Sequence, residues 1–153
     1  MPSIQSTYAE APTNAFPGAT VDFHGFRDDE PGHIEAGDLD AGTLVQRGTH
    51  PDGFIAATDG EYIGVLIRDK SKAGAATDHD LTYSHEEQVT VRKGGYIKVN
   101  FTGTGDKDDA LLYDDTTLAI SAGTAGEGET QLTGWTLAEK MTASGVAKIR
   151  IPI

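Results

Sequence analysis

The alternation of apolar and polar residues in short stretches constrains this chain more than any other feature of its sequence. Residues 97–101 and 149–153 carry an apolar side chain at every second position. A period of two places these side chains on one face of a β-strand, whereas an amphipathic helix needs spacings of three and four. Nineteen glycines supply turns between such stretches. The pattern predicts an all-β fold, a small barrel or sandwich of about seven to nine short antiparallel strands.

A hairpin is predicted within residues 87–101. Its turn would be Lys93-Gly94-Gly95, because a loop of three residues places Val91 opposite Ile97 and keeps the apolar side chains of both strands on one face. A glycine is then available for the left-handed position of the loop.

A second hairpin is predicted between Ala110 and Ser121. A two-residue turn at Asp114-Asp115 would place Leu111 opposite Leu118. The only candidate for a helix is a short stretch around residues 137–141.

The last strand is predicted over residues 147–153, with Ile149, Ile151 and Ile153 facing inward. Pro152 has no backbone N–H and cannot donate to a β-ladder. The strand is therefore expected to finish at an edge or at the end of a sheet.

The first 40 residues differ from the rest of the chain. They contain eight acidic residues and one basic residue, four of the six prolines, and no sustained period of 2 or 3.6. We expect residues 1–40 to form an extended arm with little regular structure, and residues 41–153 to form a β-rich body. Ordering such an arm costs roughly 1–2 kcal/mol per residue, so it should become ordered on another surface. The alternative is an acidic tail that stays in solvent.

Four aromatic residues stand out in this otherwise polar arm. They are Tyr8, Phe16, Phe23 and Phe26. A solvated tail is usually poor in aromatic residues, so we interpret these four as candidate contacts with a partner surface. The alternative is that they fold back onto an open edge of the chain's own barrel.

The formal net charge of −12 excludes several partners. Nucleic-acid phosphates and anionic membrane surfaces both require clustered basic residues, so neither is an expected partner. The chain has no cysteine, which excludes disulfides and thiolate metal sites. It has no apolar run of about 18 residues and no signal-peptide pattern at Met1. We therefore expect a soluble protein that is made in the cytoplasm.

No catalytic, cofactor-binding or metal-binding motif is found. Residues 103–105 have the sequence Gly-Thr-Gly, but a third glycine and a following helix are missing, so they do not form a dinucleotide site. Histidines and carboxylates gather in residues 79–87 without the spacing of a metal site. The aspartates of residues 106–115 lack the glycine and the final glutamate of a calcium loop. We predict that the protein is not an enzyme and needs no cofactor or metal.

The order of these features resembles a known family. The matching segments are residues 41–45 (AGTLV), 59–66 (DGEYIGVL), 87–99 (EQVTVRKGGYIKV), 134–137 (GWTL) and 145–151 (GVAKIRI). Together they are similar to the structural cement (capsid decoration) proteins of tailed bacteriophages.

The resemblance implies a non-enzymatic protein of the virion. Such proteins bind the outer surface of the capsid, are often homotrimers, and clamp neighbouring subunits of the major capsid protein. The arm would then lie across the capsid, attached through its aromatic residues or as an added β-strand. Two alternatives remain, a phage tail or baseplate module and a carbohydrate-binding β-sandwich. A sugar-binding role would be indicated by contact of a sugar with Trp135, the sole tryptophan.

Overall fold

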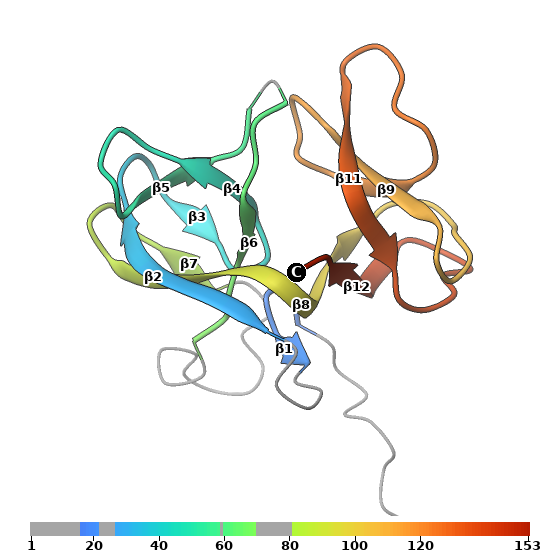
Figure 1. Cartoon of the computed structure of the whole chain (residues 1–153), viewed down its shortest axis with the longest axis horizontal. Coiled ribbons are helices and arrows are strands. Elements are labelled where there is room, and N and C mark those ends of the chain that lie inside the picture. Colours follow the sequence, from blue (N-terminus) through green and yellow to red (C-terminus); the bar gives the residue numbers. More distant parts are fainter. Residues whose placement is uncertain (1–15, 22–26, 59, 70–80) are drawn as a thin grey trace, which may run out of the picture.

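The structure is a computed structural model that describes residues 16–21, 27–58, 60–69 and 81–153. In these residues the chain forms twelve β-strands and no helix, which confirms the predicted all-β class (Figure 1). The strands are β1 (Thr20–Val21), β2 (Asp28–Ile34), β3 (Leu39–Asp40), β4 (Leu44–Arg47), β5 (Gly53–Ala56), β6 (Gly64–Leu66), β7 (Thr82–Tyr83), β8 (Gln88–Phe101), β9 (Ala110–Asp114), β10 (Ile120–Ala122), β11 (Glu129–Leu137) and β12 (Gly145–Ile151).

Five strands close into a ring that we call the C-terminal barrel. The antiparallel order is β8-β12-β11-β9-β10, and a parallel bridge between Ile120 and Phe101 joins β10 back to β8. Each of the five strands contributes side chains to the larger hydrophobic core. These are Ile97, Val99, Phe101, Leu111, Tyr113, Ile120, Leu132, Trp135, Leu137, Ala147, Ile149 and Ile151.

A second ring, the N-terminal ring, closes on the same strand β8. Its order is β8-β2-β5-β4-β6 and back to β8, with β2 and β5 parallel and the other pairs antiparallel. Each strand gives one or more residues to the smaller core, and the short sheet of β3 and β7 packs beside it. The ring residues of this core are Ile34, Val45, Phe54, Leu66, Val89 and Val91. Figure 1 shows the two rings as lobes that lie side by side, with β8 crossing from one to the other.

The predicted hairpin within residues 87–101 is wrong, because β8 runs through these residues without a turn. Val91 belongs to the smaller core and Ile97 to the larger one, so the two halves of the strand face different interiors. At the change of direction, Gly95 has a φ of 107°, and the pairing of β2 with β8 shifts register at Asp28. Alternation fits one bent strand as well as it fits a hairpin, since both keep every second side chain buried.

The second hairpin is confirmed, but its register differs. Leu111 lies opposite Ala122, not opposite Leu118, and the last pair before the turn is Tyr113 with Ile120. Leu118 is in the turn with a φ of 59°. A longer turn forms because the Asp114 carboxylate accepts hydrogen bonds from the backbone nitrogens of residues 116 and 117, each at 2.8 Å.

The C-terminal predictions are confirmed in part. Ile149 and Ile151 are buried and β12 ends directly before Pro152, as expected for a residue that cannot donate to the ladder. Ile153, however, is 71% exposed, so its inward placement is wrong. The short helix at residues 137–141 does not form. Its first residues complete the barrel instead, since the backbone nitrogen of Leu137 bonds to Asp109 and that of residue 138 to Lys148.

The expectation of little regular structure in residues 1–40 is wrong for residues 28–34. This acidic stretch is β2, which is hydrogen-bonded to both β8 and β5 and completes the N-terminal ring. Its charges are compatible with a strand because basic side chains of the neighbouring strands neutralise them, as described below. Residues 1–15 and 22–26 lie outside the described residues, so the arm remains a prediction there.

Candidate functional site

The segment Phe16–Val21 occupies the seam between the two rings, where the N-terminal part of the chain joins the body. The backbone nitrogen of Gly18 donates to the carbonyl of Lys98 in the barrel at 2.7 Å. The carbonyl of Gly18 accepts from the nitrogen of Arg68, just beyond β6 of the other ring, at 2.8 Å. Thr20 then pairs with Ile97 of β8. A short piece of the predicted arm is therefore hydrogen-bonded to both rings at once.

Only glycine fits at the centre of this seam. A β-carbon on Gly18 would lie 2.7 Å from the nitrogen of Gly42 and 2.7 Å from the carbonyl oxygen of Leu66. Gly18 also has a φ of 76° and Gly42 a φ of 85°, a region that side chains with a β-carbon disfavour. The seam therefore depends on close backbone approach, which a larger residue at either position prevents.

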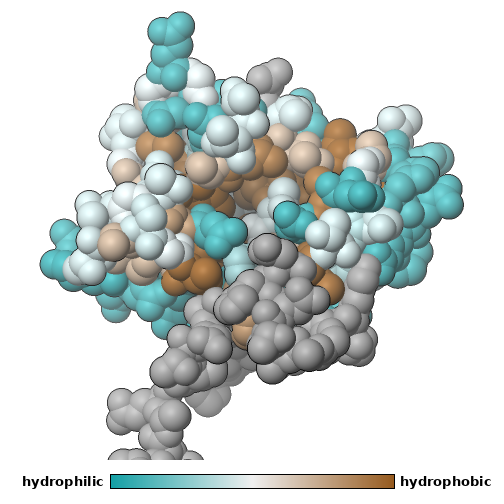
Figure 2. All heavy atoms as spheres, turned by 180° about the vertical axis from the view of Figure 1, so that it is seen from behind, coloured by the Kyte–Doolittle hydropathy of each residue, from teal (hydrophilic) through white to brown (hydrophobic). Residues whose placement is uncertain are grey.

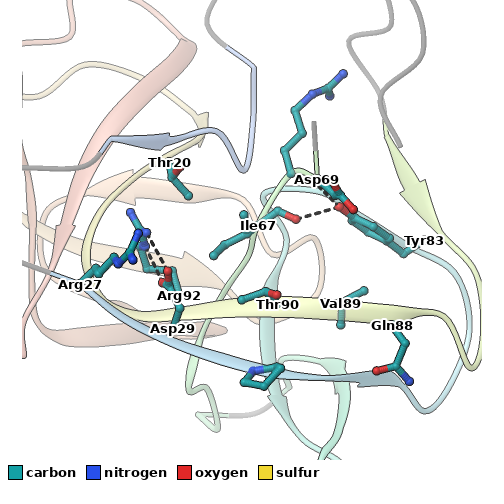
Figure 3. A pocket seen from close by; sticks show the side chains of 12 residues that line it. Thr20, Arg27, Asp29, Ile67, Asp69, Tyr83, Gln88, Val89, Thr90 and Arg92 are labelled. Atoms are coloured by element: carbon teal, nitrogen blue, oxygen red, sulfur yellow. Dashed lines mark hydrogen bonds and ion pairs between the residues drawn. The ribbon is translucent and has the colours of Figure 1, made fainter. Parts of the chain in front are cut away.

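A polar pocket of about 580 Å³ lies beside the seam, between β2, the C-terminal end of β6 and the first half of β8 (Figure 3). Figure 3 shows Arg27, Arg92 and Asp29 together at one end of it and Tyr83 at the other. The Tyr83 hydroxyl donates to the carbonyl of Ile67 at 2.9 Å and accepts from the backbone nitrogen of residue 69 at 2.7 Å. Burial raises the pKa of Tyr83. The hydroxyl is thus held neutral as a structural bridge between β7 and the segment after β6.

Arg92 forms a buried ion pair that joins β8 to β2. Its side chain is 1% exposed, and it donates to both carboxylate oxygens of Asp29 at 2.8 and 2.9 Å and to the carbonyl of Tyr96 at 2.7 Å. Two parallel hydrogen bonds from a planar guanidinium fix the orientation of both strands. This pair explains why an aspartate can sit within a strand of the ring.

A second set of charges joins β2 to both β4 and β8. Arg47 of β4 donates to both carboxylate oxygens of Glu30, and one of them, Oε2, also lies 3.0 Å from the ammonium group of Lys93. The hydrogen bond from Arg47 is the largest cause that lowers the pKa of Glu30, from 4.5 to about 2. The acidic run of β2 is therefore neutralised by β4 and β8.

The structure describes one of the four predicted contact residues. The ring of Phe16 is partly buried, and the guanidinium of Arg68 lies 4.6 Å from its centroid. Phe16 thus contacts Arg68 of its own chain at the seam, and its contact with a partner surface stays a prediction. Tyr8, Phe23 and Phe26 lie outside the described residues, so nothing is established for them.

Several site residues were missed by the sequence reasoning. Gly18 and Gly42 look like ordinary turn residues, because no local signal distinguishes a glycine that another backbone approaches. Asp29 and Arg92 did leave a signal. The run Asp28-Asp29-Glu30 matches the basic pair Arg92-Lys93 in charge, and complementary runs of this kind are found on paired strands.

The remaining chemistry of the described residues is limited. They contain no group of three or more His, Asp or Glu side chains arranged to hold a metal ion, and no helix long and apolar enough to cross a membrane. Trp135 is 4% exposed and packs edge-on against Tyr62 with 5.6 Å between ring centroids, so it offers no face for a sugar. Figure 2 shows that apolar side chains gather in the middle of the rear face, between hydrophilic flanks.

Comparison with known proteins gives a family and two similar folds. The family model described as "Structural cement protein (E217 gp24/Pam3 gp6)" matches residues 4–152. No curated protein sequence matches the chain. A chain of the capsid of Myoviridae phage XM1 has a TM-score of 0.70 at 14% identity, over 99% of this chain and 98% of that chain. The N base of head fiber gp8.5 of bacteriophage phi29 has a TM-score of 0.50 at 9% identity, over 82% and 93%. At these identities the two likenesses concern the fold alone.

Proposed function

Because this chain belongs to the family of phage structural cement proteins, we propose that it binds the outer surface of the capsid and clamps neighbouring subunits of the major capsid protein. Membership of this family assigns it a structural role in the capsid and a place in the virion. The observation that carries the proposal is the family match, which spans both rings and the seam. The fold shared with a chain of a phage capsid supports it. We further propose that the protein acts without catalysis, as a homotrimer.

The two rings suit a clamp because β8 holds them together as one continuous strand. A load applied to one ring passes along the backbone of β8 into the other, since each half of β8 is paired on both sides. The seam adds a second connection, because Phe16–Val21 bonds to both rings. A body of this kind resists being pulled apart between two attachment points.

In this proposal, residues 1–15 reach from the seam to a neighbouring capsid subunit. Tyr8, Phe23 and Phe26 are proposed contacts with the capsid. Phe16 is proposed to hold the start of the arm, where its ring contacts Arg68. One weak contact per copy then becomes strong through effective concentration when several copies are linked.

The test uses heads purified from a phage that lacks this protein. Purified wild-type protein should bind these heads saturably and raise the temperature at which they release DNA. A variant that lacks residues 1–15 should keep the wild-type melting temperature but bind at least about tenfold more weakly. Deletion of residues 1–40 is unsuitable, because it removes β1, β2 and β3 from the body.

Two outcomes separate the parts of the proposal. If the wild-type protein does not bind heads, the cement role is wrong. If the shortened protein binds as well as the wild type, the cement role stands and the arm is not the attachment.

A further inference from the structure

The outer face of the barrel carries an unusual pair of like charges. Lys98 of β8 and Lys148 of β12 lie directly opposite each other in the antiparallel ladder. Both side chains point outward, because their neighbours along each strand are fully buried. Like charges in directly opposed positions destabilise a sheet. We call the surface around these two lysines the basic face.

Within the part of the chain that the structure describes, neither lysine forms an ion pair with a carboxylate. The ion pairs there join other bases, among them Arg47, Arg92 and Lys93, to acidic partners. The Glu139 carboxylate approaches this face, but it accepts from the backbone nitrogen of Lys148 at 2.6 Å. Lys107 also forms no ion pair within the described residues, but only Lys98 and Lys148 combine the lack of an acidic partner with directly opposed positions in a ladder. In a chain of net charge −12, acidic groups of a second copy could supply the missing partner.

The same molecule carries the complementary surface elsewhere. No lysine or arginine occurs between Lys107 and Lys140. Two loops from this part of the chain meet residues 60 and 61 at one end of the barrel. Backbone bonds from residue 115 to residue 128, and from residue 60 to the Tyr113 hydroxyl, bring them together. The carboxylates of this acidic end belong to Glu61, Asp114, Asp115, Glu127 and Glu129.

The two surfaces lie at different ends of the C-terminal barrel. In Figure 1, β11 begins at the top of the view, beside the acidic loops, and its arrow points down toward β12 and β1. The acidic end and the basic face of one copy therefore cannot neutralise each other. The acidic end of one copy and the basic face of a second copy can neutralise each other.

We propose that the basic face of one copy binds the acidic end of a second copy, so that the protein assembles head to tail. This contact joins two different surfaces, and such a contact closes into a ring when the rotation between copies permits it. It deepens the proposed homotrimer and rests on that part of the proposed function. Two lysines opposite carboxylates across an exposed interface also make the association depend on salt.

The test measures mass in solution by sedimentation equilibrium and native mass spectrometry, without capsids. The wild-type protein should form a multiple of 16.1 kDa at about 25 mM salt and dissociate at least about tenfold more readily at about 500 mM. The variant Lys98→Gln/Lys148→Gln and the variant Glu61→Lys/Glu127→Lys should each be monomeric. A mixture of the two should give a complex of one copy of each and nothing larger, since only one complementary contact remains.

A matched control removes two lysine charges elsewhere. Lys107→Gln/Lys140→Gln changes the net charge equally and should keep the wild-type mass. Circular dichroism should show the same melting temperature for all variants within a few degrees, so that loss of assembly is not loss of folding. The proposal is overturned if the wild type is monomeric at low salt or if its mass does not depend on the salt concentration. It is also overturned if Lys98→Gln/Lys148→Gln assembles like the wild type. None of these results bears on the cement role, which is tested by the binding of the protein to heads.

Discussion

Gly18 and Gly42 pack backbone against backbone, so closely that a β-carbon on Gly42 would lie 2.8 Å from the nitrogen of Gly18. Through this contact the segment that leads to the N-terminal residues is fixed between the two rings. The two residues are 24 positions apart in the chain, and the seam exists only when both rings have formed.

We expect Gly18→Ala to destabilise the protein by about 2–4 kcal/mol, through a clash with the backbone in addition to strain at a positive φ. Gly37→Ala is the matched control, because Gly37 has a φ of 70° and no atom within 4 Å of an added β-carbon. The control should lose only about 1 kcal/mol. Urea denaturation measures the free energy of unfolding of both variants. Equal losses would show that close approach contributes nothing at the seam.

The buried ion pair should respond unequally to loss of its two partners. Asp29→Ala leaves the guanidinium of Arg92, which is 1% exposed, without its carboxylate, at a cost of about 3–5 kcal/mol. Arg92→Met leaves the Asp29 carboxylate, which is 24% exposed and can be hydrated. We therefore expect the second substitution to cost less. Thermal or urea unfolding of both single variants and the double variant checks the order, and the reverse order would contradict it.

Stability should fall in acid because of Glu30. Its pKa is about 2 in the folded protein, against an ordinary value of 4.5. A carboxyl with a lowered pKa stabilises the fold above about pH 4.5, and the contribution disappears as the pH falls toward 2. The pair is partly exposed, so we expect about 0.2–1 kcal/mol. The free energies of unfolding of the wild type and of Glu30→Gln should differ near pH 6 and become equal near pH 2. Asp38→Asn changes an exposed carboxylate, so its difference in stability from the wild type should not change between these pH values.

Tyr62 should matter for the contact between the rings. Its ring packs edge-on against Trp135 and Tyr113, and its hydroxyl accepts from the backbone nitrogen of Thr133 at 2.8 Å. Tyr62→Ala should lower the free energy of unfolding by about 3 kcal/mol. Tyr62→Phe should lower it by about 1 kcal/mol, since it removes only the hydrogen bonds that the hydroxyl makes with the backbone of residues 131 and 133. In the wild type, acrylamide and sugars should leave the fluorescence of Trp135 unquenched. Quenching by a sugar would restore the carbohydrate-binding alternative.

Much of the core could be identified from the sequence. Ile97, Val99, Ile149 and Ile151 are buried as their alternation predicts, because a side-chain period of two depends only on local geometry. The sequence predicts the position of the turn at Asp114 but not its length. The length depends on hydrogen bonds that the Asp114 carboxylate accepts, and the pattern of residues does not reveal them. The two-residue strands left no periodic signal, which explains why the number of strands was underestimated.

By itself, the sequence determined that the chain forms strands, which faces of them are apolar, and that the molecule is strongly acidic. The tertiary structure decided which strands pair, so that β8 serves two rings and the acidic residues 28–34 complete one of them. Alternation determines which face of a strand is buried, but it does not determine which strands lie beside it. Pairing depends on contacts with residues far away in the chain. For the same reason, the seam at Gly18 and the opposed lysines of β8 and β12 became visible only in three dimensions.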